Sequence, residues 1–483
     1  MKQLALVAVL ASATIASADP PIASSQQPAR PPPEEPPPVP QAPETTVQDT
    51  SGAPLPGQES GRTDPEPGRT TGQKVARAAL FVPKWLFAIL MAPFDAALYL
   101  EGKYQLTDLY YRSFYYRERT ISIVPTADYA TGYGLSIGAQ FTDTNTFGRD
   151  ERLVLRATTG FHYRIGLLGS IDTGDRLGPL RLEVSGNWDR RPSEPFYGIG
   201  NEGHLQPFEE GQMIDALTNP TAVQTFFRYQ EARGNLLADI KLFRHLDLDA
   251  TGSLTELKYT HGTHKFPSID DVYDPDTIVG FDETVKHLYG ELALVWDDRS
   301  SDSLWEPANV HGRGTLAVAY AGLVNQFGDV NLSDFWHYGG ELQHYFRIGF
   351  GPRVIVARYH LEGVTGPLDN IPITELPMLG SPTFLRGYTY ARFRDQIAMS
   401  ASLQYMWSLT AQTHAYVFTD VGRVYPSWDD FTLNDLHAGF GIGLEVYVAP
   451  DFIADVSIGS STDGGVALQA EFTPILDQRT RWR

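Results

Sequence analysis

The chain has 483 residues, a formal net charge of -20 and no cysteine. The acidic charge argues against nucleic-acid binding, which needs a basic patch, and the absence of cysteine excludes disulfides and thiolate-metal sites. Length alone suggests two or three domains, although a β-barrel can use this many residues as one domain.

The first 18 residues have the pattern of a secretory signal peptide. Lys2 precedes an apolar run from Leu4 to Ile15, and Ala16-Ser17-Ala18 forms a small-residue cleavage site. We therefore expect an exported protein whose mature chain begins near Asp19.

Residues 19–73 are rich in Pro, Gln, Glu, Ser, Thr and Gly, with stretches such as PPPEEPPPVPQAPE. Such a composition buries too little apolar surface to offset the entropy lost on ordering. It predicts a disordered Pro-rich linker, and a spacer role is favoured over recognition by a proline-binding partner.

Residues 74–104 form the only strongly apolar run after the signal peptide. Pro83, Lys84, Pro93 and Asp95 interrupt it, which disfavours a transmembrane helix. The segment is predicted to form short amphipathic helices at a membrane surface.

Residues 118–473 repeatedly alternate apolar and polar side chains, which indicates β-strands. In residues 396–408, for example, Ile397, Met399 and Leu403 share one face and Gln404 lies on the other. The predicted fold class is all-β, a 16-stranded antiparallel transmembrane β-barrel followed by a tail at 474–483. The predicted strands are 118–126, 131–143, 151–161, 163–173, 179–190, 223–241, 246–262, 284–298, 311–326, 333–348, 353–364, 395–408, 412–422, 434–448, 451–459 and 465–473.

The lengths of the connections favour an outer-membrane barrel over a soluble sandwich. Joins after even-numbered strands are mostly tight, whereas those after odd-numbered strands include the three longest, at about 191–222, 263–283 and 365–394. Bacterial barrels alternate short periplasmic turns and long external loops in this way.

The last of these long loops contains Leu385-Arg386-Gly387-Tyr388. An arginine at membrane depth is costly on the lipid face, so we expect Arg386 to point into the lumen and pair with an acid. The strand HAYVFTDVG offers Asp420, because a lipid face of Val417, Thr419 and Val421 turns Tyr416, Phe418 and Asp420 inward.

The following strand, HAGFGIGLEVYV, turns three glycines inward beside Asp420: Gly439, Gly441 and Gly443. They clear space for a loop, and Gly387 allows its backbone to approach closely. The predicted arrangement is an inward-folded loop, with Arg386 bonded to Asp420 and Tyr388 stacked on Phe418 or Tyr416.

These two motifs together resemble those of the BamA/TamA-like outer-membrane assembly superfamily, the bacterial surface-antigen barrels. Leu385 to Tyr388 match the family's V/I/L-R-G-F/Y loop, and Phe418, Asp420 and Gly422 match its F-x-D-x-G strand. Gln404 stands where the family carries an acid near the arginine. The segment between signal peptide and barrel contains no recognisable polypeptide-transport-associated (POTRA) domain.

The resemblance implies a bacterial outer-membrane protein that inserts or moves proteins, with no chemistry and no cofactor. Its partners would be outer-membrane lipid and lipopolysaccharide, with unfolded outer-membrane proteins and a separate periplasmic protein as further candidates. The alternative is a porin-like passive channel or a surface-exposed structural barrel. A barrel phospholipase ranks third, because no Ser/His/acid set shares one edge.

Three other motifs are given structural interpretations. GLSIG at 134–138 lies in an alternating strand rather than at a nucleophile elbow, and GIGNEG at 198–203 lacks the context of a dinucleotide site. His261 and His264 with the acidic run 270–276 indicate a solvated external loop. We therefore expect no catalytic and no metal-binding residues.

Overall fold

The structure is a computed structural model that describes residues 112–160, 164–211, 213–218, 221–300, 312–328, 332–349, 353–409, 413–448 and 451–471. The predicted signal peptide (1–18), linker (19–73), helical segment (74–104) and tail (474–483) lie outside these residues. Among the residues described, no helix is both long and apolar enough to cross a bilayer.

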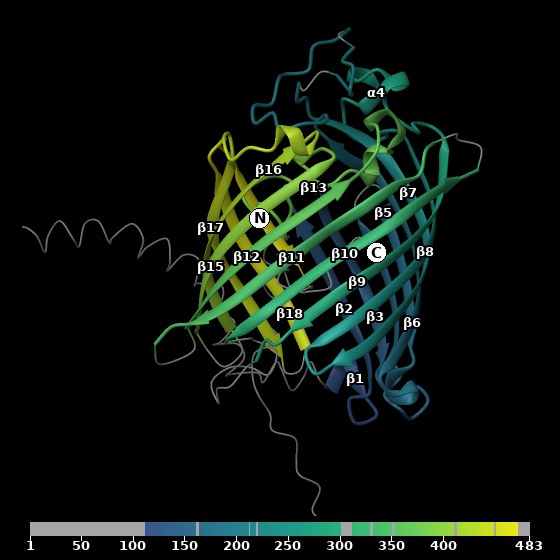
Figure 1. Ribbon diagram of the computed structural model, residues 1–483, viewed down its shortest axis with the longest axis vertical. Coiled ribbons are helices and arrows are strands. Elements are labelled where there is room, and N and C mark those ends of the chain that lie inside the picture. The colour runs from purple at the N-terminus through teal and green to yellow at the C-terminus, as the bar shows by residue number, and fades with distance from the viewer. Residues whose placement is uncertain are drawn as a thin grey trace, which may run out of the picture. The chain divides into compact units, whose positions relative to one another are not determined.

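Sixteen antiparallel strands form a closed barrel, and the short β1 adds to it as a seventeenth member of the sheet. Figure 1 shows the strands running obliquely around the barrel, with α4 among the loops at one end and β1 at the other. The strands are β1 (Tyr115–Tyr116), β2 (Ile121–Ala130), β3 (Gly134–Asp143), β4 (Leu153–Gly160), β5 (Arg164–Asp172), β6 (Leu180–Phe196), β7 (Thr225–Phe243), β8 (Leu246–His261), β9 (Thr284–Asp297), β10 (Gly314–Phe327), β11 (Phe335–Arg347), β12 (Arg353–Val364), β13 (Met378–Leu379), β14 (Phe393–Arg394), β15 (Ile397–Ser408), β16 (Thr413–Tyr425), β17 (His437–Val448), β18 (Asp451–Ser461) and β19 (Val466–Glu471).

The connections between the described strands contain short helical turns: α4 (Ile269–Val272), η2 (Gly174–Leu177), η3 (Pro275–Thr277), η4 (Leu368–Asn370), η5 (Ile373–Glu375) and η6 (Trp428–Asp430). The predicted all-β class and the 16-stranded barrel are confirmed.

Several strand boundaries differ from those predicted, most of all in the first and fifth barrel strands. The first barrel strand is β2 at Ile121–Ala130 rather than 118–126, because Arg117, Glu118 and Arg119 have positive φ and form the turn between β1 and β2. β6 continues to Phe196, past the predicted end at residue 190, through a register shift between Arg191 and Glu194.

The barrel has the opposite polarity to a water-soluble protein: its apolar side chains face outward and its polar side chains face the lumen. Large apolar side chains on alternate strand positions are exposed on the outer wall; Leu155, Leu292 and Phe440 expose 50%, 61% and 52% of their surface. The intervening positions turn polar side chains into a buried lumen, among them Gln343 and Gln404. An apolar exterior and a polar interior are typical of barrels that lie in lipid.

The loops at the α4 end of the barrel have an apolar core of their own, which we call the dome. Phe196 at the end of β6, Tyr273 and Ile373 are far apart in the sequence and lie in one buried cluster. Phe196 packs edge-on against Tyr273, with ring centroids 5.1 Å apart. The dome therefore joins loops that the strand order alone would leave separate.

The barrel closes between β19 and β2, a junction we call the seam. Its register in the described residues contains two pairs, Gln469 with Ala130 and Ala470 with Tyr129, whereas β2 and β3 pair over ten positions. β1 pairs with β2 at its opposite end, through Ile121 and Ser122. Because β3 takes one edge of β2, β1 and β19 share the other.

Candidate functional site

The connection between β12 and β15, residues 365–396, folds into the lumen, and we call it the internal loop. Its base is a two-stranded hairpin of β13 and β14, and its tip carries the Leu385–Tyr388 motif. Leu385 has φ 57° and Gly387 has φ 97°. A left-handed backbone is costly for leucine, and Leu385 is held there in a buried cluster with Leu379 and Phe393.

Arg386 and Asp420 form a two-point contact at this tip. Nε of Arg386 donates to Oδ2 of Asp420 at 2.9 Å, and Nη2 donates to Oδ1 at 2.9 Å. The backbone N–H of Arg386 also donates to Asp420, and the remaining guanidinium groups bond to Gln404 and Ser402. Both charged side chains are at most 3% exposed, so the pair is shielded from water.

The inward glycines make room for this contact. Gly439 lies opposite Asp420 in the β16–β17 register, and a β-carbon there would lie 1.7 Å from the carbonyl oxygen of Arg386. Gly441 faces the ring of Phe418 and Gly443 faces that of Tyr416, each too closely for a side chain. The predicted space beside Asp420 is therefore occupied by loop backbone and two aromatic rings.

The predicted partner of Tyr388 is wrong. The guanidinium of Arg386, not the Tyr388 ring, lies over Phe418, 3.8 Å from the ring centroid. Tyr388 instead packs edge-on against Phe393 at 5.2 Å and approaches His437. The stack on Phe418 or Tyr416 fails because the arginine itself covers that aromatic face.

Gly422, the last residue of the strand motif, also accommodates the loop. It pairs with Ser400 on β15, and a β-carbon at Gly422 would lie 3.0 Å from Cδ1 of Leu379 on β13. The motif glycine thus allows the base of the internal loop to lie against the barrel wall.

A second set of contacts holds the loop to β12. Nη1 of Arg358 donates to the carbonyl of Thr383 at 3.0 Å, and its guanidinium lies 4.5 Å from the Phe384 ring centroid. His360 stacks on Phe384 with centroids 3.8 Å apart. Arg358 is in turn bonded to Glu341 at 2.6 Å. The loop is thus fixed to four neighbouring strands, β12 and β15 to β17.

The same loop touches both strands that flank the seam. The hydroxyl of Tyr388 donates to Asp463 at 2.9 Å, in the turn between β18 and β19. Burial raises the pKa of Tyr388 to about 12, which keeps the hydroxyl protonated as a donor. Across the seam, the N–H of Tyr390 donates to the carbonyl of Thr131 at 3.1 Å, and the N–H of Thr131 donates to Leu468 on β19.

The loop also joins the dome. Arg392 donates to the carbonyls of Glu202 and Gly203 at 2.7 and 2.9 Å, and Gly200 pairs with Arg394. His437 completes this junction, stacked on Phe393 at 4.1 Å. The sequence GIGNEG is therefore a loop segment that meets the internal loop, and GLSIG lies within β3.

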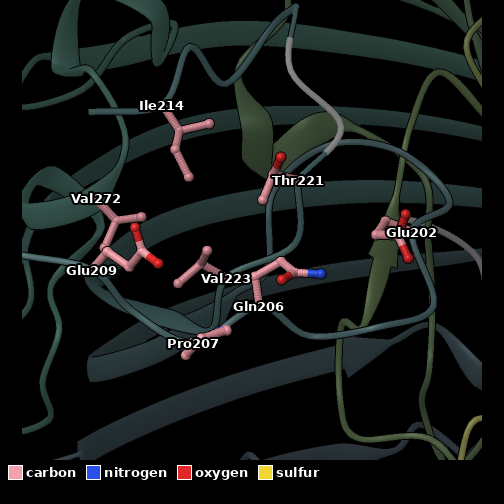
Figure 2. Close-up of a pocket in the computed structure, with 8 residues that line it drawn as sticks. All are labelled: Glu202, Gln206, Pro207, Glu209, Ile214, Thr221, Val223 and Val272. Atoms are coloured by element: carbon pink, nitrogen blue, oxygen red, sulfur yellow. The ribbon is translucent and has the colours of Figure 1, made fainter. Parts of the chain in front are cut away.

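Open spaces in the barrel and in the dome include the following two. One, of about 480 Å³, lies along β2 to β8, with Arg156, Asn187 and Asn235 among its polar lining. The other, of about 400 Å³, lies in the dome loops; Figure 2 shows its apolar side chains Ile214 and Val223 together with the polar Gln206. Within the part of the chain that the structure describes, no group of acidic and histidine side chains is arranged to hold a metal ion.

The sequence reasoning missed several contributors to this site, among them Ser402, Asp463, Thr131 and His437. Ser402 lies two positions before Gln404 on the inward face of β15, so period-two alternation could have identified it. Asp463 and Thr131 lie in turns, where alternation gives no direction.

No protein-family model matches the sequence, and no curated protein matches it. Solved structures that are similar in fold include the following three. BamA from Haemophilus ducreyi lacking POTRA domains 1–3 is 12% identical, with 73% of this chain and 69% of that chain covered and a TM-score of 0.49. CdiB from Acinetobacter baumannii is 12% identical, covering 72% and 58%, with a TM-score of 0.45. CdiB from Escherichia coli is 12% identical, covering 72% and 62%, with a TM-score of 0.47. The chain spans less than two thirds of either CdiB chain.

Proposed function

We propose that this protein lies in the bacterial outer membrane and inserts or translocates other polypeptides through its seam, with the internal loop as the brace that controls it. The exposed apolar outer wall supports the membrane location, because an aqueous protein would bury such side chains. The paired motifs of Arg386 and Asp420 support the family role. Its partners would be outer-membrane lipid and lipopolysaccharide, unfolded barrel proteins and a separate periplasmic protein.

One observation carries the proposal: a single loop bonds to both sides of a short junction. Tyr388 reaches the β18–β19 turn, and Tyr390 reaches Thr131 at the end of β2. These contacts add to the two described register pairs and to the bonds between Thr131 and Leu468. A movement of the loop would therefore change how firmly the first and last barrel strands are joined.

The test is to lock the seam. Ala130→Cys with Gln469→Cys places two thiols at a register pair across the seam, and the chain has no other cysteine to mispair. We expect the purified protein to accelerate the assembly of a second barrel in liposomes, to lose this activity when the pair is oxidised, and to regain it on reduction. Thr142→Cys with Val154→Cys, a register pair between β3 and β4, is the matched control.

A passive channel is the second candidate, favoured by the polar space of about 480 Å³ that the internal loop leaves along β2 to β8. Purified protein that conducts ions and leaves the assembly rate of the second barrel unchanged would establish the channel and reject the insertion role.

A further inference from the structure

Carboxylates are aligned across the seam. Glu445 on β17 lies opposite Asp455 on β18, and Asp455 lies opposite Glu471 on β19. The seam register pairs Ala470 with Tyr129, so the next position sets Glu471 opposite Asp128 on β2. Four acids thus occupy one row on four neighbouring strands, and we call it the acid row.

The acid row faces the lumen. The hydroxyl of Tyr416 donates to both oxygens of Asp455, at 2.8 and 2.9 Å, and Asp128 bonds to Arg156 on β4 at 3.1 Å. Glu471 lies on the same face as Gln469, two residues earlier, which accepts a bond from Ser457. Glu445 and Asp455 are 3% and 1% exposed.

Other charged and titratable groups surround the row, among them Tyr345 on β11, which interacts electrostatically with Glu445. β16 contributes His414, the register partner of Glu445, as well as Tyr416. β3 places the neutral Ser136 opposite Asp128. Arg386, in the internal loop, attracts Asp455 electrostatically, but its guanidinium already forms an ion pair with Asp420. Like charges that lie directly opposite on neighbouring strands destabilise the pairing.

The acid row lies directly beside the described seam pairing. The register between β19 and β2 runs through Gln469 and Ala470, and the next position on the two strands is Glu471 and Asp128. Electrostatic repulsion between these two carboxylates therefore acts across the seam itself.

We infer that the acid row makes the seam sensitive to protons: ionised carboxylates weaken the pairing of β19 with β2, and protonation strengthens it. This inference rests on the proposed function, because repulsion in the acid row has a functional consequence only if the seam opens. At higher pH the last strand separates more readily from the first; at lower pH the barrel stays closed.

Distances between spin labels measure the separation of β19 from β2, and they need no thiol reaction at the pH of the measurement. Nitroxides are attached at Tyr129→Cys and Ile458→Cys on β2 and β18, whose neighbours in the register are Ala470 and Leu468 on β19. Pulsed dipolar distances are recorded in liposomes at about pH 5 and about pH 8. Ile137→Cys with Leu167→Cys, on β3 and β5, is the control, because these two strands likewise flank a single strand, β4.

We expect the population with the longer seam distance to be about threefold larger at the higher pH, from the usual strength of a like-charge pair, and the control distances to stay constant. Asp128→Asn with Glu471→Gln should abolish the response. Glu471→Lys, which places a cation between two acids, should keep the seam closed at both pH values. A wild-type distribution that ignores pH, or a neutralised variant that keeps the response, overturns the inference.

The two hypotheses fail separately. If distances ignore pH and the Ala130–Gln469 disulfide still stops assembly of the second barrel, the acid row is rejected and the proposed function stands. If the oxidised disulfide leaves assembly unaffected, the proposed function is rejected whatever the labels report.

Discussion

The carbonyl oxygen of Arg386 lies 1.7 Å from the position that a β-carbon on residue 439 would take. The internal loop is therefore seated against the backbone of β17, and not merely against its side chains. This closeness makes the loop sensitive to one methyl group.

Gly439→Ala should displace the tip of the loop. Because the obstructing atom belongs to the backbone, the cost should be about 1–3 kcal/mol, as for other overpacked sites. Hydrogen exchange of residues 381–394 should rise. Gly252→Ala, on β8 with nothing within 4 Å of the added carbon, is the control and should leave exchange unchanged. Equal behaviour of the two variants would contradict the close approach.

Arg386→Ala should release the loop more completely. It leaves the carboxylate of Asp420 buried without its cation, a change that typically costs about 3–5 kcal/mol. We expect a lower temperature of heat-modified gel migration and a higher single-channel conductance.

Lys286→Ala is the control for the loss of a cation from an ion pair. Lys286 and Glu256 are 3.3 Å apart, but their side chains are 43% and 58% exposed, so the variant should cost less than about 1 kcal/mol. An Arg386→Ala protein that melts and conducts like the control would refute the bracing role.

Tyr388→Phe should loosen the last hairpin while keeping the ring packed on Phe393. It removes one hydroxyl bond to a carboxylate, worth about 1.5–3 kcal/mol. Faster hydrogen exchange is expected in residues 462–471 and not in β3 or β4. Tyr338→Phe, which loses a bond to the Trp428 indole, is the control. Unchanged protection of the hairpin would show that Asp463 does not couple loop and seam.

Glu375, in the internal loop, should give the folded barrel a pH dependence. Burial raises its pKa to about 8, with Arg233 opposing this shift. Unfolded, the carboxyl ionises near its ordinary value of 4.5, so the folded state binds more protons between the two values. Stability is greatest below the unfolded pKa and falls as pH rises through about 8.

Melting temperatures at about pH 5, 7 and 9 measure this effect, which should be on the order of 2 kcal/mol. Glu375→Gln should flatten the decline, whereas Glu283→Gln, at an exposed position, should leave it intact. If stability still declines with pH in Glu375→Gln, other titratable groups cause the decline.

The strands could be predicted because one face of the barrel meets lipid and the other meets a polar lumen. Apolar and polar side chains therefore alternate with a period of two residues along each strand. The alternation of Phe418 and Asp420 with Val417 and Thr419 shows this in β16, where the first two are buried and Val417 is 39% exposed. The start of β2 could not be placed in this way. Arg117 and Arg119 take left-handed backbone conformations that charge and hydropathy do not indicate.

The site was accessible to prediction only where strands define it. Asp420 and the glycines on β17 have directions fixed by alternation, so their place beside a loop could be foreseen. Tyr388 lies in a loop tip, where alternation says nothing about direction. Its true partners, Phe393 and Asp463, follow from how the whole loop is folded.

The dome has a consequence for how this chain can be observed. Its apolar cluster draws on residues from Phe196 to Leu376, which come together only after β6 to β12 have been placed side by side. An antibody whose epitope spans two of these connections would thus discriminate between completed and unfinished chains. Added to refolding protein, it would count finished molecules without any functional assay.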